Sequence, residues 1–142
     1  MDIDKIYRSG RVLRWHSYPE IECQTNAQHQ WGVAVIIMAN HPNPSAELLK
    51  AALLHDAGEI VVGDMPKPCK DKKPELLAEY EKAEALALDG MGIKLNLTKK
   101  EQAWLEWAGR AEAYRWMVAN NHALRHKPEW KYAALWIEEN KP

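Results

Sequence analysis

Apolar residues recur along most of the chain at the three- and four-residue spacing of an α-helix. The densest apolar segment, residues 31–38, ends at the helix-breaking sequence Pro42-Asn43-Pro44, and Asn26 can cap the helix that contains it. Ser45 can cap the following helix, which ends near Gly58. Because its apolar residues are so dense, the helix over residues 26–40 is predicted to be central.

Three more helices are predicted in the second half of the chain. Pro74 stands in the first turn of a helix that Gly90 stops, and Thr98-Lys99-Lys100-Glu101 is a capping box that begins a long helix. A last helix is expected over residues 128–139. Between Gly63 and Pro74 the sequence holds three prolines and four lysines, which predicts an exposed loop without a regular element.

A β-sheet is not expected. The β-branched residues cluster only at 33–37 and 60–62, and no Asn-Gly or Asp-Gly turn joins two strand-like segments. The chain has 142 residues, 46% of them apolar and 27% charged, which is typical of one compact globular unit. These features predict a single all-α domain of five to seven helices over residues 1–142.

The charges of the chain almost cancel. Nineteen Lys plus Arg against twenty Asp plus Glu leave a formal charge of -1, so no overall basic field favours a nucleic acid polymer. Cys23 and Cys69 form no Cys-x-x-Cys pair, which fits reduced thiols in a cytoplasmic compartment but leaves a single disulfide open. The longest apolar run, 33–39, is too short to cross a bilayer, and the N-terminus lacks the apolar segment of an export signal. We therefore expect no membrane association.

Several ionisable residues stand where their polarity is costly. His55 and Asp56 follow an apolar run, and His29 lies in the middle of the apolar helix 26–40. Taken singly, each has an ordinary explanation, such as a helix cap, a dipole-stabilised histidine or a hydrogen-bonded core histidine. A divalent metal ion would satisfy all three at once, because imidazole nitrogen and carboxylate oxygen are both good ligands.

The joint pattern is more specific than its parts. Arg14-Trp15, His29, His55-Asp56-x-x-Glu59 and Gly63-Asp64-x-Pro-x-Pro follow one another in the order of a known family. In these motifs the chain resembles the HD-domain phosphohydrolases, in particular the bacterial 5′-deoxynucleotidases and the phage deoxynucleoside triphosphate (dATP) hydrolases. The segment 112–114 also looks like the last motif of that family. The resemblance implies a compact HD-domain helical bundle.

The resemblance also implies a metal site. His29, His55 and Asp56 match the residues that hold one divalent ion, which could be Co, Mn, Zn, Mg or Fe. Glu59 matches the acid/base residue that activates water, and Asp64 matches a carboxylate that supports the catalytic site or positions the substrate. Such an arrangement suits hydrolysis at phosphorus, because a metal ion polarises the phosphoryl group while a carboxylate takes a proton from water.

The expected substrate contacts come from two parts of the chain. By resemblance, Arg14 meets the phosphate and Trp15 forms a wall against the sugar and base, and a guanidinium can bind phosphate through two hydrogen bonds. Lys67, in the predicted loop, could hold a further phosphate, although a solvated lysine is the commoner role of such a residue. The expected partner is a free deoxynucleotide, as a monophosphate or a triphosphate, and a homo-oligomer is compatible with the sequence. The expected location is the cytoplasm, or the host cytoplasm for a phage protein.

One position departs from the family pattern. Where the family has a last aspartate ligand, this chain has Gly109, and no aspartate follows Asp89. Glu106 and Glu112 share the helix face of Gly109, so either of them, or water, could take the missing place. We therefore weigh two functions, a metal-dependent phosphohydrolase of free 2′-deoxynucleotides and a non-catalytic nucleotide-binding or interaction module of the same fold.

Overall fold

The computed structural model describes all residues, 1–142, and confirms the all-α prediction. Eight α-helices, one 3-10 helix and a pair of two-residue strands follow in the order α1 (Ile3–Ser9), β1 (Leu13–Arg14), β2 (Gln24–Thr25), α2 (Asn26–Asn40), α3 (Ala46–Leu54), α4 (Glu59–Val62), α5 (Lys67–Lys72), α6 (Pro74–Gly90), α7 (Lys99–Asn120), η1 (His122–His126) and α8 (Pro128–Glu139). Of the five longer helices, α2, α6, α7 and α8 match the predicted ranges, while α3 ends at Leu54, before the predicted end near Gly58. The short helices α1, α4 and α5 and the strand pair were not predicted.

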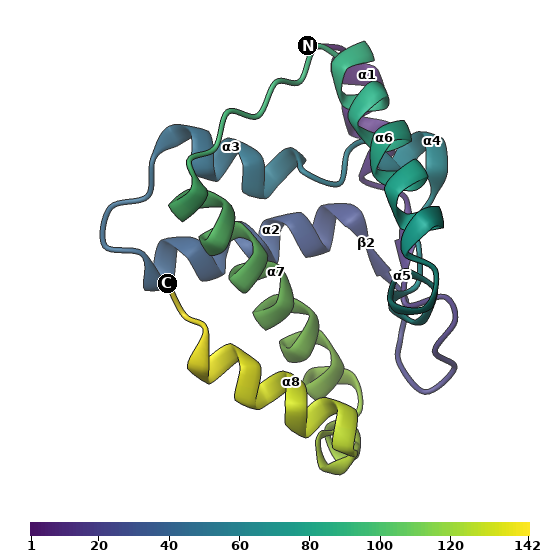
Figure 1. Cartoon of the computed structure of the whole chain (residues 1–142), viewed down its shortest axis with the longest axis vertical. Helices are drawn as coiled ribbons and strands as arrows, with labels where there is room; N and C mark the ends of the chain where they lie inside the picture. Colours follow the sequence, from purple (N-terminus) through teal and green to yellow (C-terminus); the bar gives the residue numbers. More distant parts are fainter.

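The core lies where α2 meets α3 and α7. Figure 1 shows α7 crossing α2 near the middle of the molecule, with α8 running back alongside α7. Ile37 and Leu48 are fully buried there, and Trp104 and Trp107 of α7 pack edge to face against each other. The indole Nε1 of Trp107 donates to the carbonyl oxygen of Ile137 at 2.8 Å, which fastens α8 to this core.

Local capping sets where the main helices begin. Ser45 caps α3 and Thr98 forms the predicted capping box of α7 with Glu101. The expectation for α2 was wrong in one respect, because Thr25 and Gln28 form its capping box and Asn26 does not cap it. The side chain of Asn26 is thereby free for another contact, described below.

A second group of helices packs beside this core. Figure 1 shows α1, α4, α5 and α6 together on one side, away from α8. The chain joins the two groups through the turn of residues 55–58, where a Cβ on Gly58 would lie 2.6 Å from the backbone oxygen of Glu84. The backbone of that turn therefore lies directly against α6.

The prediction of an irregular loop between Gly63 and Pro74 was wrong, because α5 occupies Lys67–Lys72. Pro66 precedes α5, Pro68 lies in its first turn and Pro74 begins α6. Proline is tolerated at these positions because the first-turn amides of a helix have no intrahelical acceptor. These prolines therefore mark two helix starts.

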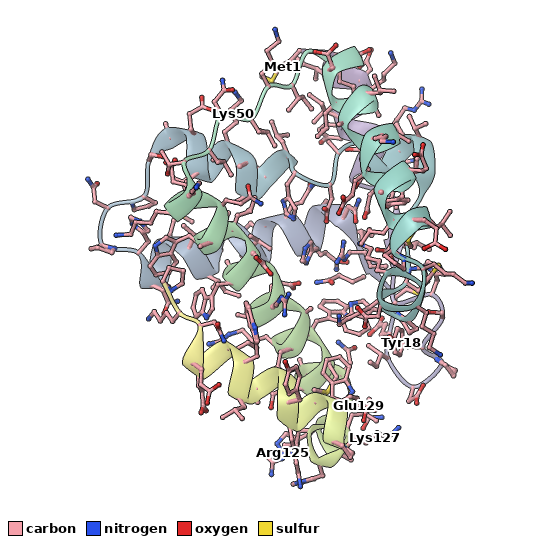
Figure 2. The ribbon with its side chains drawn as sticks, viewed as in Figure 1. Met1, Tyr18, Lys50, Arg125, Lys127 and Glu129 are labelled. Carbon is pink, nitrogen blue, oxygen red and sulfur yellow. The ribbon has the colours of Figure 1, made fainter.

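The strands β1 and β2 close a hairpin that packs against the far end of α7. Leu13 pairs with Thr25 and Arg14 with Gln24 in an antiparallel arrangement. Tyr18, in the hairpin loop, packs with Trp15 onto a small apolar cluster around Ile21, Met117 and Leu124. Figure 2 shows Tyr18 at the same end of the molecule as Glu129 of α8. No helix has both the length and the hydrophobicity required to cross a membrane.

Candidate active site

Three segments bring the predicted ligands together. His29 lies in the first turn of α2, not in its middle as the sequence suggested, and His55 and Asp56 occupy the turn after α3. The two imidazole rings have their centroids 5.6 Å apart. Oδ2 of Asp56 lies 3.6 Å from Nε2 of His29, and Oδ1 lies 3.4 Å from Nε2 of His55. The carboxylate therefore lies between two ring nitrogens that both face it.

The other nitrogen of each ring is already engaged. Nδ1 of His55 lies 3.1 Å from the carbonyl oxygen of Ala51, and Nδ1 of His29 hydrogen-bonds a carboxylate oxygen of Glu112 on α7. Each of these partners is a hydrogen-bond acceptor, so Nδ1 is the donor and Nε2 keeps its lone pair. Metal-binding histidines in proteins have this arrangement, with the distal N–H bound to a carbonyl or carboxylate. The donor set of two imidazoles and one carboxylate therefore fits a divalent transition metal ion.

One guanidinium faces three carboxylates. Nη1 of Arg14 donates to Oδ2 of Asp56 at 2.8 Å, and it lies 3.9 Å from Oε1 of Glu59 and 3.8 Å from Oδ1 of Asp64. Burial opposes the charged form of Asp56, but the charge of His55 when it is protonated in acid, that of Arg14 and that of protonated His29 outweigh it and lower the pKa of Asp56 to about 2. Asp56 is therefore ionised at neutral pH.

Glu59 is almost completely buried in the first turn of α4. Nδ2 of Asn26 donates to Oε2 of Glu59 at 2.7 Å, and the hydroxyl oxygen of Tyr80 lies 3.3 Å from Oε1. Burial and the nearby charge of Asp56 raise the pKa of Glu59 to about 8. A carboxyl group with a pKa near neutrality can both take and release a proton at physiological pH.

A second glutamate, which is half-buried, lies beside Asp56 and Glu59. Glu84 of α6 has a carboxylate oxygen within 4.8 Å of ligand atoms of Asp56 and Glu59. Burial, followed by the charge of Asp56, raises the pKa of Glu84 to about 7. The sequence did not single out Glu84, because it lies in a helix with many exposed glutamates.

The predicted substrate residues divide into two groups. Arg14 lies at the site. Trp15 is connected to it through Gln24, because Nε1 of Trp15 donates to Oε1 of Gln24 at 3.2 Å and Gln24 in turn donates to Glu112. Trp15 has a φ of 66°, a left-handed conformation that is uncommon for a residue with a side chain. Lys67 lies elsewhere, on an exposed face of α5, where its ammonium pairs with Asp71 at 2.9 Å.

The structure separates the candidates for the missing ligand. Glu106 is half-exposed and pairs with Arg110 at 2.8 Å, while Glu112 binds His29 on the Nδ1 side, away from Asp56. A Cβ at Gly109 would meet no atom within 4 Å. Neither glutamate lies on the Nε2 side, so the protein offers three ligands there, and the space beside Gly109 is open.

Four residues of the site have no clear signal in the sequence. The sequence suggests Asn26 only as a helix cap, and it does not single out Gln24, Tyr80 or Glu84. Each contact depends on residues far apart in the chain, such as the bond between the hydroxyl of Tyr80 and the carbonyl oxygen of Gly63 at 2.5 Å. A fifth residue of the site, Glu112, is singled out by the sequence, but as a possible ligand of the metal and not as a partner of His29.

Comparison with known proteins confirms the family resemblance. A family model described as 5′-deoxynucleotidase YfbR-like matches residues 4–103, which include every predicted site residue. The chain is 29% identical over 90 residues to a 5′-deoxynucleotidase of Vibrio vulnificus, covering 56% of this chain and 46% of that protein. It is 31% identical over 89 residues to a 5′-deoxynucleotidase of Shewanella oneidensis, with the same two coverages.

The match has defined limits. The chain spans about half the length of the curated relatives it matches, and the family match ends before Gly109 and Glu112 of α7. The family match covers about seven tenths of this chain, from α1 to the start of α7. It includes His29, His55, Asp56 and Glu59. By fold, motif order and sequence, the chain therefore belongs to the YfbR-like family of HD-domain proteins.

Proposed function

We propose that this chain is a metal-dependent phosphohydrolase that removes the 5′-phosphate of free 2′-deoxynucleoside monophosphates. The observation that carries the proposal is the convergence of Nε2 of His29 and Nε2 of His55 on the carboxylate of Asp56. Beside these three lies a buried carboxyl group, Glu59, whose pKa is raised to about 8. The motifs alone do not show this proximity.

A single divalent ion held by His29, His55 and Asp56 would polarise the phosphoryl group and lower the pKa of water. Glu59 lies next to Asp56 and can accept the proton that the attacking water loses. Asn26 donates to one oxygen of Glu59, and the hydroxyl of Tyr80 lies 3.3 Å from the other, so the carboxyl group has a defined direction. Proton transfer to a positioned carboxylate contributes about 10²- to 10⁴-fold to the rate of such reactions.

Arg14 is the residue best placed to bind the phosphate. Its Nη1 already contacts Asp56, which puts the guanidinium next to the predicted ligand set. Its Nε is buried and has no hydrogen-bond partner within the protein. A buried donor without a partner is costly, so a phosphate oxygen that accepted from it would be bound favourably. Asp64 lies 3.8 Å from Arg14 and helps to keep the guanidinium in place.

A monophosphate is favoured over a triphosphate by two observations. The relatives named above carry the name 5′-deoxynucleotidase and not that of a triphosphate hydrolase. Lys67, the residue expected to hold an additional phosphate, pairs with Asp71 on an exposed face of α5. A triphosphate hydrolase releasing inorganic triphosphate remains the alternative outcome of the experiment below.

A non-catalytic nucleotide-binding module is the second candidate function. It is favoured by Gly109, where the family pattern has a ligand, and by the ion pair of Arg14 with Asp56, which balances the charge of this ligand without a metal ion. Such a module would bind deoxynucleotides without turning them over. It would also show no stabilisation by Co²⁺ or Mn²⁺, because an ion that binds only the folded state must raise its melting temperature.

One experiment separates these functions. The purified protein, loaded in turn with Co²⁺, Mn²⁺, Zn²⁺, Mg²⁺ and Fe²⁺, is incubated with deoxy- and ribonucleoside mono-, di- and triphosphates, and the products are separated by chromatography. We expect nucleoside and phosphate from deoxynucleoside monophosphates only, and none from His55→Ala. The variant His126→Ala, which changes an exposed histidine of η1, is the matched control and should keep full activity. Turnover that survives in His55→Ala would refute the proposed site.

A further inference from the structure

Glu112 of α7 holds the far side of the His29 ring. One oxygen of its carboxylate hydrogen-bonds Nδ1 of His29, and the other accepts from Nε2 of Gln24 at 2.6 Å. All three side chains are buried. A buried imidazole held by a carboxylate through Nδ1 presents Nε2 in one orientation and one tautomer.

We infer that Glu112 is a positioning residue, which fixes the Nδ1–H tautomer of His29 and aims its Nε2 toward Asp56. This role differs from direct ligation, because Glu112 lies on the Nδ1 side of the ring and Asp56 lies on the Nε2 side. The inference deepens the proposed function, since it concerns the same metal site. Its first readout requires no metal, so the two can fail separately.

Close helix packing brings Glu112 within reach of His29. A Cβ at Gly32, three residues after His29 on α2, would lie 2.7 Å from Cγ of Glu112 and 3.0 Å from its Oε1. Any side chain at position 32 would therefore push the carboxylate away. Gly32 makes no other contribution to the site, so it offers a way to displace Glu112 without removing any functional group.

Gln24, which holds Glu112, also contacts Trp15, the residue predicted to line the substrate site. Gln24 donates to Glu112 through Nε2 and accepts from the indole of Trp15 through Oε1. These two bonds determine which way the amide of Gln24 points, because its nitrogen must face the carboxylate and its oxygen the indole. The position of Glu112 is thus tied to the hairpin that carries Arg14 and Trp15.

The first test reads the tautomer of His29 in the metal-free protein. Long-range ¹H–¹⁵N correlation spectra report which ring nitrogen carries the proton, and the signal of His29 is assigned by its loss in His29→Gln. We expect the Nδ1–H form in the wild type and a mixture or the Nε2–H form in Glu112→Met, which keeps the volume but has no carboxylate. An unchanged Nδ1–H tautomer in Glu112→Met would overturn the inference.

The second test measures the dissociation constant of Co²⁺ by titration of its visible absorption. Loss of such an outer carboxylate weakens metal binding by about 10- to 100-fold, and we expect this for Glu112→Met. Glu112→Gln keeps one acceptor oxygen and should fall between the wild type and Glu112→Met. A Co²⁺ affinity of Glu112→Met within about threefold of the wild type, well short of that range, would overturn the inference.

A matched pair of glycine variants guards against misfolding of the Glu112 variants. Gly32→Ala should weaken Co²⁺ binding and shift the tautomer of His29, while Gly90→Ala should do neither, because a Cβ at Gly90, at the end of α6, meets no atom within 4 Å. Equal behaviour of the two variants would show that displacing Glu112 has no effect on His29. A wild type that binds no Co²⁺ would contradict the proposed function, and the tautomer would still decide the role of Glu112.

Discussion

Nη1 of Arg14 lies 2.8 Å from Oδ2 of Asp56, so the residue predicted to bind phosphate is paired with a residue predicted to bind metal. The same guanidinium lies within 4 Å of Glu59 and Asp64. Without it, the carboxyl groups of Asp56, Asp64 and Glu59 would face one another in a largely buried space, where repulsion between the ionised ones is weakly screened. A positive charge at this place therefore stabilises the folded protein.

Replacing Arg14 should make the protein depend on metal for its stability. We expect Arg14→Met to lower the free energy of unfolding of the metal-free protein by about 3 kcal/mol, because removing one partner leaves a buried charge unpaired. Added Co²⁺ should raise the melting temperature of Arg14→Met more than that of the wild type. Urea denaturation with and without Co²⁺ measures both effects. The exposed Arg11→Met serves as the control, and an equal response of all three proteins would contradict this account.

Replacing Glu59 should separate catalysis from metal binding. We expect Glu59→Gln to lower kcat by about 10²- to 10⁴-fold, because the amide cannot accept the proton of water. The Co²⁺ affinity should stay close to that of the wild type, since the proposed ligands are unchanged. Steady-state kinetics and Co²⁺ titration give the two values. Glu106→Gln, on the exposed side of α7, should match the wild type in both, and a Glu59→Gln enzyme of normal kcat would exclude Glu59 as the base.

Gly58 should tolerate no side chain. Its Cβ would lie 2.6 Å from the backbone oxygen of Glu84, and the backbone of α6 cannot rotate away as a side chain would. Overpacking of this kind costs about 1–3 kcal/mol, which we expect for Gly58→Ala in urea denaturation. Gly90→Ala, at the end of α6, is the control because its Cβ meets no atom within 4 Å. Equal stability of the two variants would show that α6 is not packed against the turn.

The start of α7 should respond to acid. Hydrogen bonds from the hydroxyl of Ser45 and from the amide and hydroxyl of Thr98 lower the pKa of Glu101 from its ordinary value of 4.5 to about 2. A carboxyl group whose pKa is lower in the folded state stabilises the fold above its unfolded pKa. This contribution is complete above about pH 4.5 and disappears as the pH falls toward 2.

Glu101→Gln should therefore lose less stability than the wild type between pH 7 and pH 3. Melting temperatures at the two pH values measure the difference. The other acidic groups are present in both proteins, so their contribution to the pH dependence cancels in the comparison. Glu138→Gln, which changes a glutamate of α8 outside this capping box, should behave like the wild type. A pH dependence of Glu101→Gln equal to that of the wild type would contradict the role of the capping box.

The sequence predicts the long helices well because their signals are local. The capping box at Thr98 and the cap at Ser45 act within three residues, and the apolar spacing repeats over several turns. The prediction of an irregular loop at α5 is wrong because prolines exclude a helix only in its interior, whereas Pro68 and Pro74 stand at helix starts. Position in a helix, and not proline content alone, decides the effect of a proline.

The site was predictable only as a set of motif residues. His29, His55, Asp56 and Glu59 carry the family pattern, so their proximity could be expected. The contacts that orient them could not, because the partners lie 33 residues away for Asn26 and Glu59 and 83 residues away for His29 and Glu112. No periodicity or cap within one helix reports on such pairs, which depend on how α2, α4 and α7 pack.

The hairpin of β1 and β2 is held to the fold by few backbone contacts. Its strands have two residues each, and the amides of Asn26 and Ala27 tie its base through bonds of 2.9 and 3.1 Å to the carbonyl oxygens of Val12 and Gly10. Backbone amides with few hydrogen bonds exchange with solvent at a lower free-energy cost than those of a long helix. We therefore expect the amide hydrogens of this hairpin to exchange with solvent faster than those in the centre of α2. Its side chains are held more firmly, because Arg14 pairs with Asp56 and Ile21 is buried in the cluster with Met117.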